Sequence, residues 1–292
     1  MPKTTIYGLL TLAAASSLFA LGFMYTAPNT YHRQIPRSGE REIKVTIEAG
    51  FAKLNLGLGK SSAVLEAEVT TDNPDDVTNL IDYSVRDKVG YLTLNTDGSD
   101  GHKNRVFHIS NFEQSKWTTN FTDEIPISFD IQLGLGKGDF DLSGLSVKDL
   151  SLSAGASSVR VRFDQPNKSV IDNLNIEAGL SKFESHGLGN ANFRHFRFQG
   201  GVGSYVLDFG GEMKLEADAD IEVGFGSLVI YVPKNTGVKI ITDKNLVTHF
   251  DIDDDFTEQR EDNYLSSNYY TAAAKLNMRI DAGVGNVKIR RE

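Results

Sequence analysis

The chain has 292 residues, a formal net charge of −9 and a pI near 5.2. This acidic balance argues against nonspecific nucleic-acid binding, which needs a basic face. The chain contains no cysteine, so disulfide frameworks, thiolate metal sites and thiol nucleophiles are excluded. Its length allows one or two domains with a substantial core.

The N-terminus carries an apolar run over residues 6–25, which ends shortly before Pro28. Twenty apolar residues fit either a membrane-spanning helix or the hydrophobic core of a signal peptide. Residues 1–27 are therefore predicted to be a signal peptide or a single membrane anchor. Either alternative predicts export to the periplasm or cell envelope; as an anchor, residues 6–25 would hold the protein in the membrane.

Next comes a polar stretch, residues 28–42, which is predicted to be a linker. Residues 43–128 are predicted to form an N-terminal β lobe that contains the first repeat unit. Alternating strands are expected at 63–69, 91–94 and 106–109, separated by turn-rich segments. Because terminal repeats need a cover, we expect this lobe to cap the rest of the molecule.

A twelve-residue phrase then dominates the chain. It reads apolar-x-apolar-x-apolar/Gly-Gly-x-small-x-apolar-x-apolar, as in Leu174–Ser185. The alternation predicts two short strands with one buried face each, and the glycine predicts a tight corner between them. Seven copies centre on these corner glycines: Gly50, Gly136, Gly155, Gly179, Gly201, Gly224 and Gly283.

The middle copies follow one another at intervals of 19 to 24 residues, which is typical of a stacked repeat fold. The sequence therefore predicts an all-β protein: a single-stranded β-solenoid, or β-helix-like stack of about 22-residue coils, with a β cap lobe. A β-sandwich of hairpins is the alternative, but the corners lack the Asn-Gly or Asp-Gly pairs of hairpin turns. Residues 129–292 are assigned to the solenoid, with an insertion at 234–275.

Two kinds of glycine-rich phrase imitate nucleotide motifs. Gly57–Ser61 resembles the end of a phosphate-binding loop, but the first glycine of that motif is replaced by Leu54 and a strand is expected to follow. The Gly-x-Gly pieces at the corners are not followed by helices, which a dinucleotide site requires. We therefore expect no nucleotide and no other cofactor.

A row of polar residues precedes the corners by two positions and should point outward. Carboxylates along such a row could serve sugar chemistry, or simply form a solvated face. The acidic run 251–262 could bind calcium, although a solvated loop fits it better, and the histidines show no metal-ligand spacing. No catalytic, cofactor-binding or metal-binding residues are assigned. The row contains Glu48, Gly134, Ser153, Glu177, Gln199, Glu222 and Asp281, of which Glu177, Glu222 and Asp281 are the candidate interaction residues.

Three long phrases, at residues 133–145, 150–159 and 223–238, resemble the bacterial toastrack domain. This domain is the soluble part of LiaF-like cell-envelope stress-response proteins, and the resemblance covers about residues 43–291. It implies a β-helix-like stack and a role in envelope-associated regulation or assembly, with no catalytic residues to transfer. LiaF-like proteins carry several membrane helices before this domain, whereas this chain has one candidate segment.

These observations predict a non-enzymatic bacterial cell-envelope protein that acts in envelope-stress regulation or as an assembly scaffold. Its expected partners are envelope proteins, a second copy joined at an uncovered end of the stack, and the membrane if residues 1–27 stay attached. Nucleic acid and nucleotides are not expected. The alternative is a β-helix protein that binds or cleaves polysaccharide.

Overall fold

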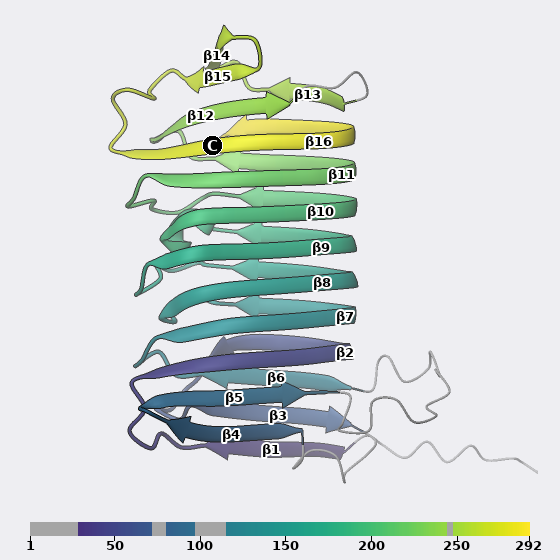
Figure 1. The fold of residues 1–292 in the computed structure, drawn as a ribbon, viewed down its shortest axis with the longest axis vertical. Coiled ribbons are helices and arrows are strands. Elements are labelled where there is room, and N and C mark those ends of the chain that lie inside the picture. The colour runs from purple at the N-terminus through teal and green to yellow at the C-terminus, as the bar shows by residue number, and fades with distance from the viewer. Residues whose placement is uncertain (1–28, 72–79, 97–114, 244–247) are drawn as a thin grey trace, which may run out of the picture.

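The computed structural model describes residues 29–71, 80–96, 115–243 and 248–292. Long strands form the body of the molecule, stacked one above another (Figure 1). Each bends once near its middle and pairs in parallel with its neighbours through both halves. The strands of this body, in spatial order, are β2 (Glu42–Leu58), β7 (Ile127–Asp141), β8 (Val147–Arg162), β9 (Ile171–His186), β10 (Phe193–Asp208), β11 (Ala217–Val232) and β16 (Ala274–Arg291).

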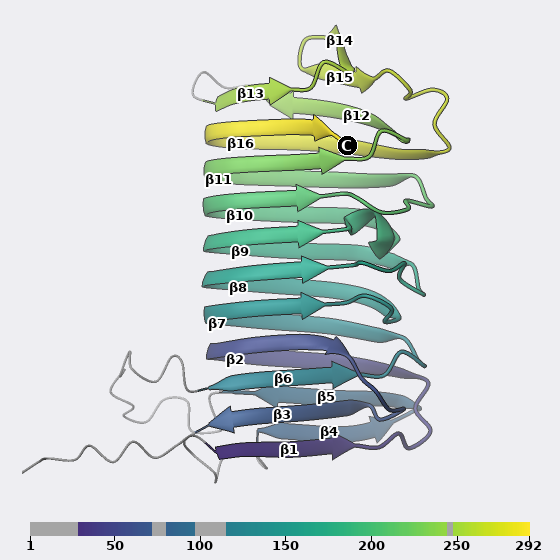
Figure 2. The same ribbon diagram turned by 180° about the vertical axis from the view of Figure 1, so that it is seen from behind.

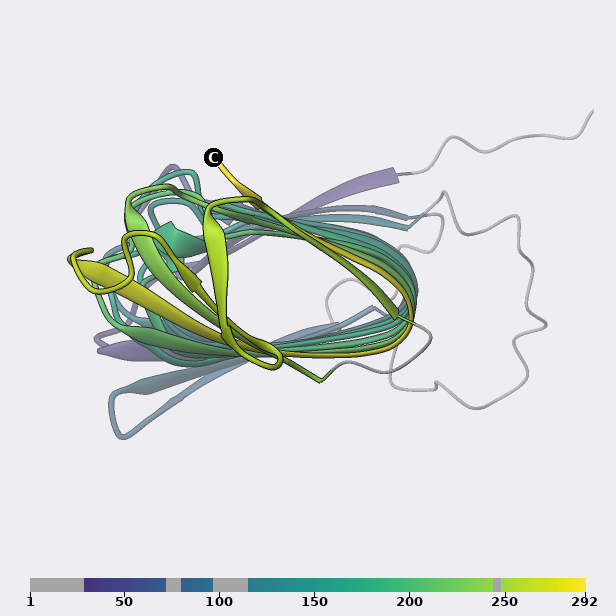
Figure 3. The same cartoon turned by 90° about the horizontal axis from the view of Figure 1, so that it is seen from above.

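Each body strand is one coil of a flattened solenoid. Seen along the stack, the two halves of every strand form two facing layers that join at one rounded edge (Figure 3). We call this side the bent edge; loops close the opposite side. The predicted all-β solenoid is thus confirmed, with strand, corner and strand fused into one continuous bent strand per coil.

Alternating side chains fill the space between the two layers. In β9, Leu174, Ile176 and Ala178 are buried before the bend, and Phe183 is buried after it. This period of two is what a strand with one buried face requires. The core therefore runs the whole length of the stack.

Aromatic rings pack against one another in this core, both between successive coils and across a single coil. The ring centroids of Phe183 and Phe198 lie 5.3 Å apart, and those of Phe198 and Tyr205 lie 5.2 Å apart. Phe196 meets Phe209 edge to face at 5.6 Å. Such contacts add to the stabilisation from buried area. The first pair joins β9 to β10, whereas the other two pairs join the two layers within the coil of β10.

The sequence predicts the wrong register for the second coil, β7. Gly50 is flanked by Ala49 and Phe51, which pair with Leu133 and Leu135, so Gly134 rather than Gly136 is the equivalent corner glycine. The same alignment continues into β8. Both registers satisfy the repeat phrase because this coil contains glycines at every second position from 134 to 138. Only cross-strand pairing distinguishes them.

The N-terminal end of the stack is covered by a cap built from the residues around β2. Its strands are β1 (Asn29–Ile35), β3 (Leu65–Thr71), β4 (Ile81–Arg86), β5 (Val89–Asn95) and β6 (Lys116–Phe121). β5 pairs with the first half of β2 and β6 with its second half. The expected cap lobe is therefore present. The predicted linker at 28–42 needs correction, because β1 pairs antiparallel with β3 and belongs to the cap.

The C-terminal end mirrors this arrangement (Figure 2). The strands here are β12 (Thr236–Asp243), β13 (Thr248–Ile252), β14 (Phe256–Arg260) and β15 (Asn263–Ser266). β12 lies on the first half of β16 and β13 on its second half, while β15 and β14 extend the sheet antiparallel. The predicted insertion at 234–275 is thus a further coil and cap, and the last body strand lies beneath it.

A short 3-10 helix, η3 (Leu188–Ala191), interrupts the β structure in the loops opposite the bent edge. Within the described ranges, no helix is long and apolar enough to cross a membrane. The predicted signal peptide or anchor at 1–27 and the predicted strand at 106–109 lie outside the described residues.

Candidate functional site: the bent edge

The bent edge exposes the same positions in every coil. In β9, Glu177 is exposed, Ala178 is buried, Gly179 and Leu180 at the tip of the bend are both exposed, and Lys182 is exposed on the other layer. Because the coils stack in register, each position becomes a row along the molecule. Four rows follow from this, and we name them the acceptor row, the glycine row, the apolar ridge and the donor row.

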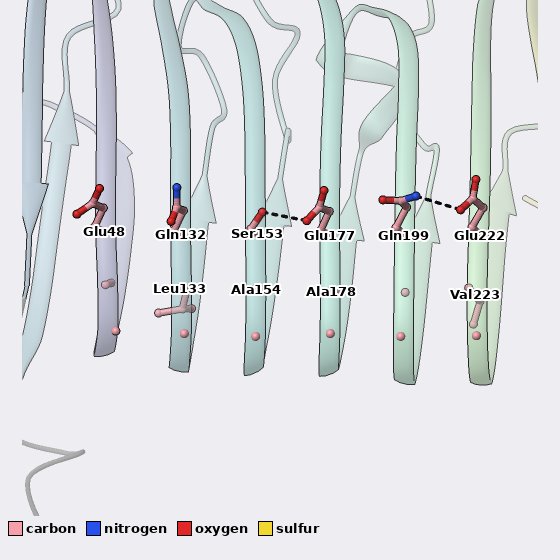
Figure 4. Close-up of a pocket in the computed structure, with 18 of the residues that line it drawn as sticks. Glu48, Gln132, Leu133, Ser153, Ala154, Glu177, Ala178, Gln199, Glu222 and Val223 are labelled. Carbon is pink, nitrogen blue, oxygen red and sulfur yellow. Dashed lines mark hydrogen bonds between the residues drawn. The ribbon is translucent and has the colours of Figure 1, made fainter. Parts of the chain in front are cut away.

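The acceptor row lies two residues before the glycine. It contains the three predicted interaction residues. In the corrected register, Gln132 and not the predicted Gly134 occupies this position in β7. Ser153 Oγ donates to Glu177 Oε2 at 3.3 Å, and Gln199 Nε2 donates to Glu222 Oε2 at 3.0 Å (Figure 4). The members of the acceptor row are Glu48, Gln132, Ser153, Glu177, Gln199, Glu222 and Asp281.

The glycine row is explained by coil stacking. A Cβ atom on Gly155 would lie 2.5 Å from the carbonyl oxygen of Gly134, and one on Gly283 would lie 2.5 Å from that of Gly224. The corresponding distance is 2.7 Å for Gly134, 2.8 Å for Gly201 and 2.9 Å for Gly224, so backbone contact excludes a side chain there; Gly179, at 3.2 Å, is tight but less crowded. The members are Gly50, Gly134, Gly155, Gly179, Gly201, Gly224 and Gly283; Gly136 belongs two residues further on, opposite Ala52.

A groove of about 1240 Å³ runs along these two rows. Its floor is the bare backbone of the glycine row, and the acceptor row stands along one side. Glu48, Glu177, Glu222 and Asp281 contribute negative charge, and the residues that line the groove include no lysine, arginine or histidine. The groove is therefore anionic and rich in hydrogen-bond acceptors.

The apolar ridge directly follows the glycine row and was missed by sequence reasoning. Leu180 is 65% exposed, Phe225 55% and Val202 48%. A second hollow, of about 430 Å³, lies beside the ridge where Ala156 is small. The sequence carries the necessary pattern, because the residue after every corner glycine is apolar: Phe51, Leu135, Ala156, Leu180, Val202, Phe225 and Val284.

The donor row lies on the far side of the ridge. Lys182 Nζ lies 2.7 Å from Glu184 Oε1, and Arg160 Nη2 lies 3.1 Å from the other oxygen of the same carboxylate. The hydrogen bond from Lys182, helped by Arg160, holds the pKa of Glu184 below its ordinary value despite partial burial. The members are Lys53, Lys137, Ser158, Lys182, Ser204, Ser227 and Asn286.

Part of the negative charge of the acidic run 251–262 is paired with arginines of the same chain. Asp251 forms an ion pair with Arg290, and Asp255 Oδ2 accepts from Arg291 Nε at 2.9 Å. The hydrogen bond from Arg290 holds the pKa of Asp251 below its ordinary value. Among the described residues, no group of three or more His, Asp or Glu side chains is arranged to hold a metal ion.

These features define the molecule as a β-solenoid whose coils are stacked into one long, regularly patterned edge. A family model described as the N-terminal domain of toast_rack, DUF2154, matches residues 26–184, more than half of the chain. The chain therefore belongs to the toast-rack family, as the sequence phrases indicate. No protein with a curated description matches it.

Several solved structures are distantly similar. A protein of Clostridium sporogenes, provisionally described as a cell adhesion protein, is 21% identical, with 91% of this chain and 100% of that chain covered and a TM-score of 0.47. A provisional adhesin of Bacteroides fragilis is 13% identical over 90% and 97% of the two chains, with a TM-score of 0.32. A protein of Parabacteroides distasonis, provisionally described as lipid binding, is 13% identical over 91% and 98%, also with a TM-score of 0.32.

Proposed function

We propose that this protein is a non-catalytic component of the bacterial cell envelope whose bent edge binds a partner. The main support for this proposal is the apolar ridge, which leaves a large side chain exposed in five of the seven body strands: Leu135, Leu180, Val202, Phe225 and Val284. Monomeric soluble proteins rarely expose a contiguous apolar surface without using it for contact. The groove and the two polar rows beside the ridge supply the directional contacts that a specific interface needs.

The envelope location is proposed from the sequence. The apolar run at residues 6–25 suits export or anchoring, and the toast-rack phrases resemble those of envelope stress-response proteins. A rigid stack of this kind suits a regulator or an assembly scaffold, because it holds many contact groups at fixed spacing of about 4.8 Å without moving parts.

The proposal is tested in cells that express the full chain. A photo-reactive amino acid is placed at Leu180, or, as a control, at Asn173, which is exposed in the same coil away from the bend. We expect the protein in the envelope fraction, with covalent adducts formed from position 180 and not from 173. A cytosolic protein that forms no adduct from position 180 would contradict the proposal.

A polysaccharide-binding or polysaccharide-cleaving function is the second candidate, and the acceptor row is the observation that favours it. Glu222 and Asp281 occupy adjacent strands, and Glu177 lies two strands from Glu222. Strand spacing gives backbone separations of about 5 and 10 Å, in the range used by paired carboxylates in glycoside hydrolysis. Cleavage of an envelope glycan that is lost in Glu222→Gln would establish this alternative.

A further inference from the structure

The residues on either side of the apolar ridge match each other in every coil. In β2, Glu48 precedes the bend and Lys53 follows it; in β9, the corresponding pair is Glu177 and Lys182. The remaining coils place Gln132 with Lys137, Ser153 with Ser158, Gln199 with Ser204, Glu222 with Ser227 and Asp281 with Asn286. Every coil thus carries a hydrogen-bond acceptor on one side of the ridge and a donor on the other.

The ridge and the groove are also matched in height. Each ridge side chain follows its own corner glycine directly, so every large side chain has a bare stretch of groove floor at the same level of the stack. Leu180 stands beside Gly179, Val202 beside Gly201 and Phe225 beside Gly224. The bent edge therefore presents a knob and a hole in these coils.

A two-fold axis parallel to the stack brings these features together. Such an axis keeps every coil at its own level and exchanges the two sides of the edge. The ridge of each molecule then enters the groove of the other, so that Leu180 of one copy faces Gly179 of its partner. The acceptor row of each copy faces the donor row of the other, and Glu48 and Glu177 meet lysines at their own level.

We propose that the partner bound by the bent edge is a second copy of this chain, held in a parallel, side-by-side homodimer. This inference rests on the proposed function and names its partner. It differs from association at an open end of the stack, because both ends are covered by caps while the bent edge repeats the same complementary contact along the body.

Other occupants of the edge match it less well. An antiparallel pair of copies would place ridge against ridge and carboxylate against carboxylate, which is unfavourable. An anionic lipid surface would face the four carboxylates of the acceptor row as well as the ridge. The parallel pair alone satisfies the ridge, the groove and both polar rows.

Cysteine cross-linking tests the arrangement cleanly, since the chain has no cysteine of its own. Leu135→Cys and Val284→Cys lie five strands apart on the ridge, or about 24 Å at 4.8 Å per strand. In intact cells that express the full chain, a short, membrane-permeable bismaleimide should join each variant to itself. An antiparallel pair would cross-link only when the two variants are co-expressed, and Asn173→Cys serves as the control away from the ridge.

Charge reversal tests the facing rows, with the yield of the Val284→Cys cross-link as readout. Glu177→Lys and Lys182→Glu should each lower the yield roughly tenfold, because symmetry repeats every altered contact. The double variant should restore it. Within one chain, Lys182 binds Glu184 and Glu177 accepts from Ser153, so a purely internal role would not give this rescue.

The outcomes separate this inference from the proposed function. Photo-adducts from position 180 to other proteins, without self-cross-linking of Leu135→Cys and Val284→Cys, would overturn the homodimer and leave the interaction edge in place. The absence of both would overturn both. Cross-linking only in the co-expressed mixture, or vesicle binding by a monomeric chain, would also overturn the parallel dimer.

Discussion

At the residue scale, the bend is made possible by a second set of small residues, two positions after the corner glycines. This row contains Ala52 and Ser181 but also glycines with positive φ, such as Gly226 at +134° and Gly285 at +144°. A Cβ atom on Gly226 would lie 1.9 Å from the carbonyl oxygen of Gly203. The backbone conformation and the distance to the next coil both require glycine there.

We therefore expect Gly226→Ala to destabilise the fold by at least ~3 kcal/mol, since it combines backbone strain with a backbone clash. Gly39→Ala is the matched control, because Gly39 also has a positive φ, +102°, but nothing lies within 4 Å of its added Cβ. That variant should cost about 1–2 kcal/mol from strain alone. Denaturant unfolding of both measures the difference, and equal losses would mean that coil contact adds nothing.

At the element scale, both ends of the body depend on strands that lie out of chain order. β2 is covered by β5 and β6, which follow it, and β16 is covered by β12 and β13, which precede it. Arg291 anchors the C-terminal cover on β16, and its side chain is only 1% exposed. Its guanidinium donates to the carbonyl oxygens of Thr236 and Lys234, both at 3.0 Å.

Arg291→Leu should release the C-terminal cap. Loss of the guanidinium removes its hydrogen bonds to the Thr236 and Lys234 carbonyl oxygens and its ion pair with Asp255, and breaking such a buried ionic contact costs about 3–5 kcal/mol. Hydrogen exchange should speed up over β12, β14 and β15 while β8 and β9 remain protected. Arg290→Leu, which removes a more exposed ion pair with Asp251, should have a smaller effect; equal effects would show that burial of Arg291 is unimportant.

At the scale of the whole molecule, the sequence predicts the stack because one phrase repeats at nearly constant spacing, and alternation reveals which face is buried. It predicts Glu177, Glu222 and Asp281 as outward residues for the same reason. It does not resolve Gly134 from Gly136, since both fit the phrase. It also does not place β2 beside β7 across residues 59–126, because strand order depends on pairing between distant segments.

The apolar ridge could not be predicted from the sequence for a different reason. By simple alternation, Leu180 and Phe225 occupy a position with no assigned face, because the bend places two consecutive residues in solvent. Alternation describes straight strands, so it cannot say where the side chain after a corner points. The ridge thus becomes recognisable as a surface only when the geometry of the bend is known.

Nearest-neighbour stacking has a consequence for the length of the molecule. Residues 180–201 extend from the ridge position of β9 to the corner glycine of β10, and their removal joins Gly179 to Val202 in the same register, since Leu180 and Val202 pair. Repeat proteins draw their stability from each unit and its neighbours. The shortened chain should therefore fold as a stack with one coil fewer, with reduced stability and a smaller denaturant dependence.

Deletion of residues 180–202 is the matched control, because one further residue inverts the second half of the new strand. Tyr205 and Leu207, both buried in the native coil, would then point to solvent, and Ser204 would enter the core. Since a one-residue slip exchanges the two faces of a strand, this variant should lose cooperative unfolding, as followed by circular dichroism. If both deletions unfold alike, the coils do not act as separable units, and the stability of the stack must depend on contacts longer in range than one coil.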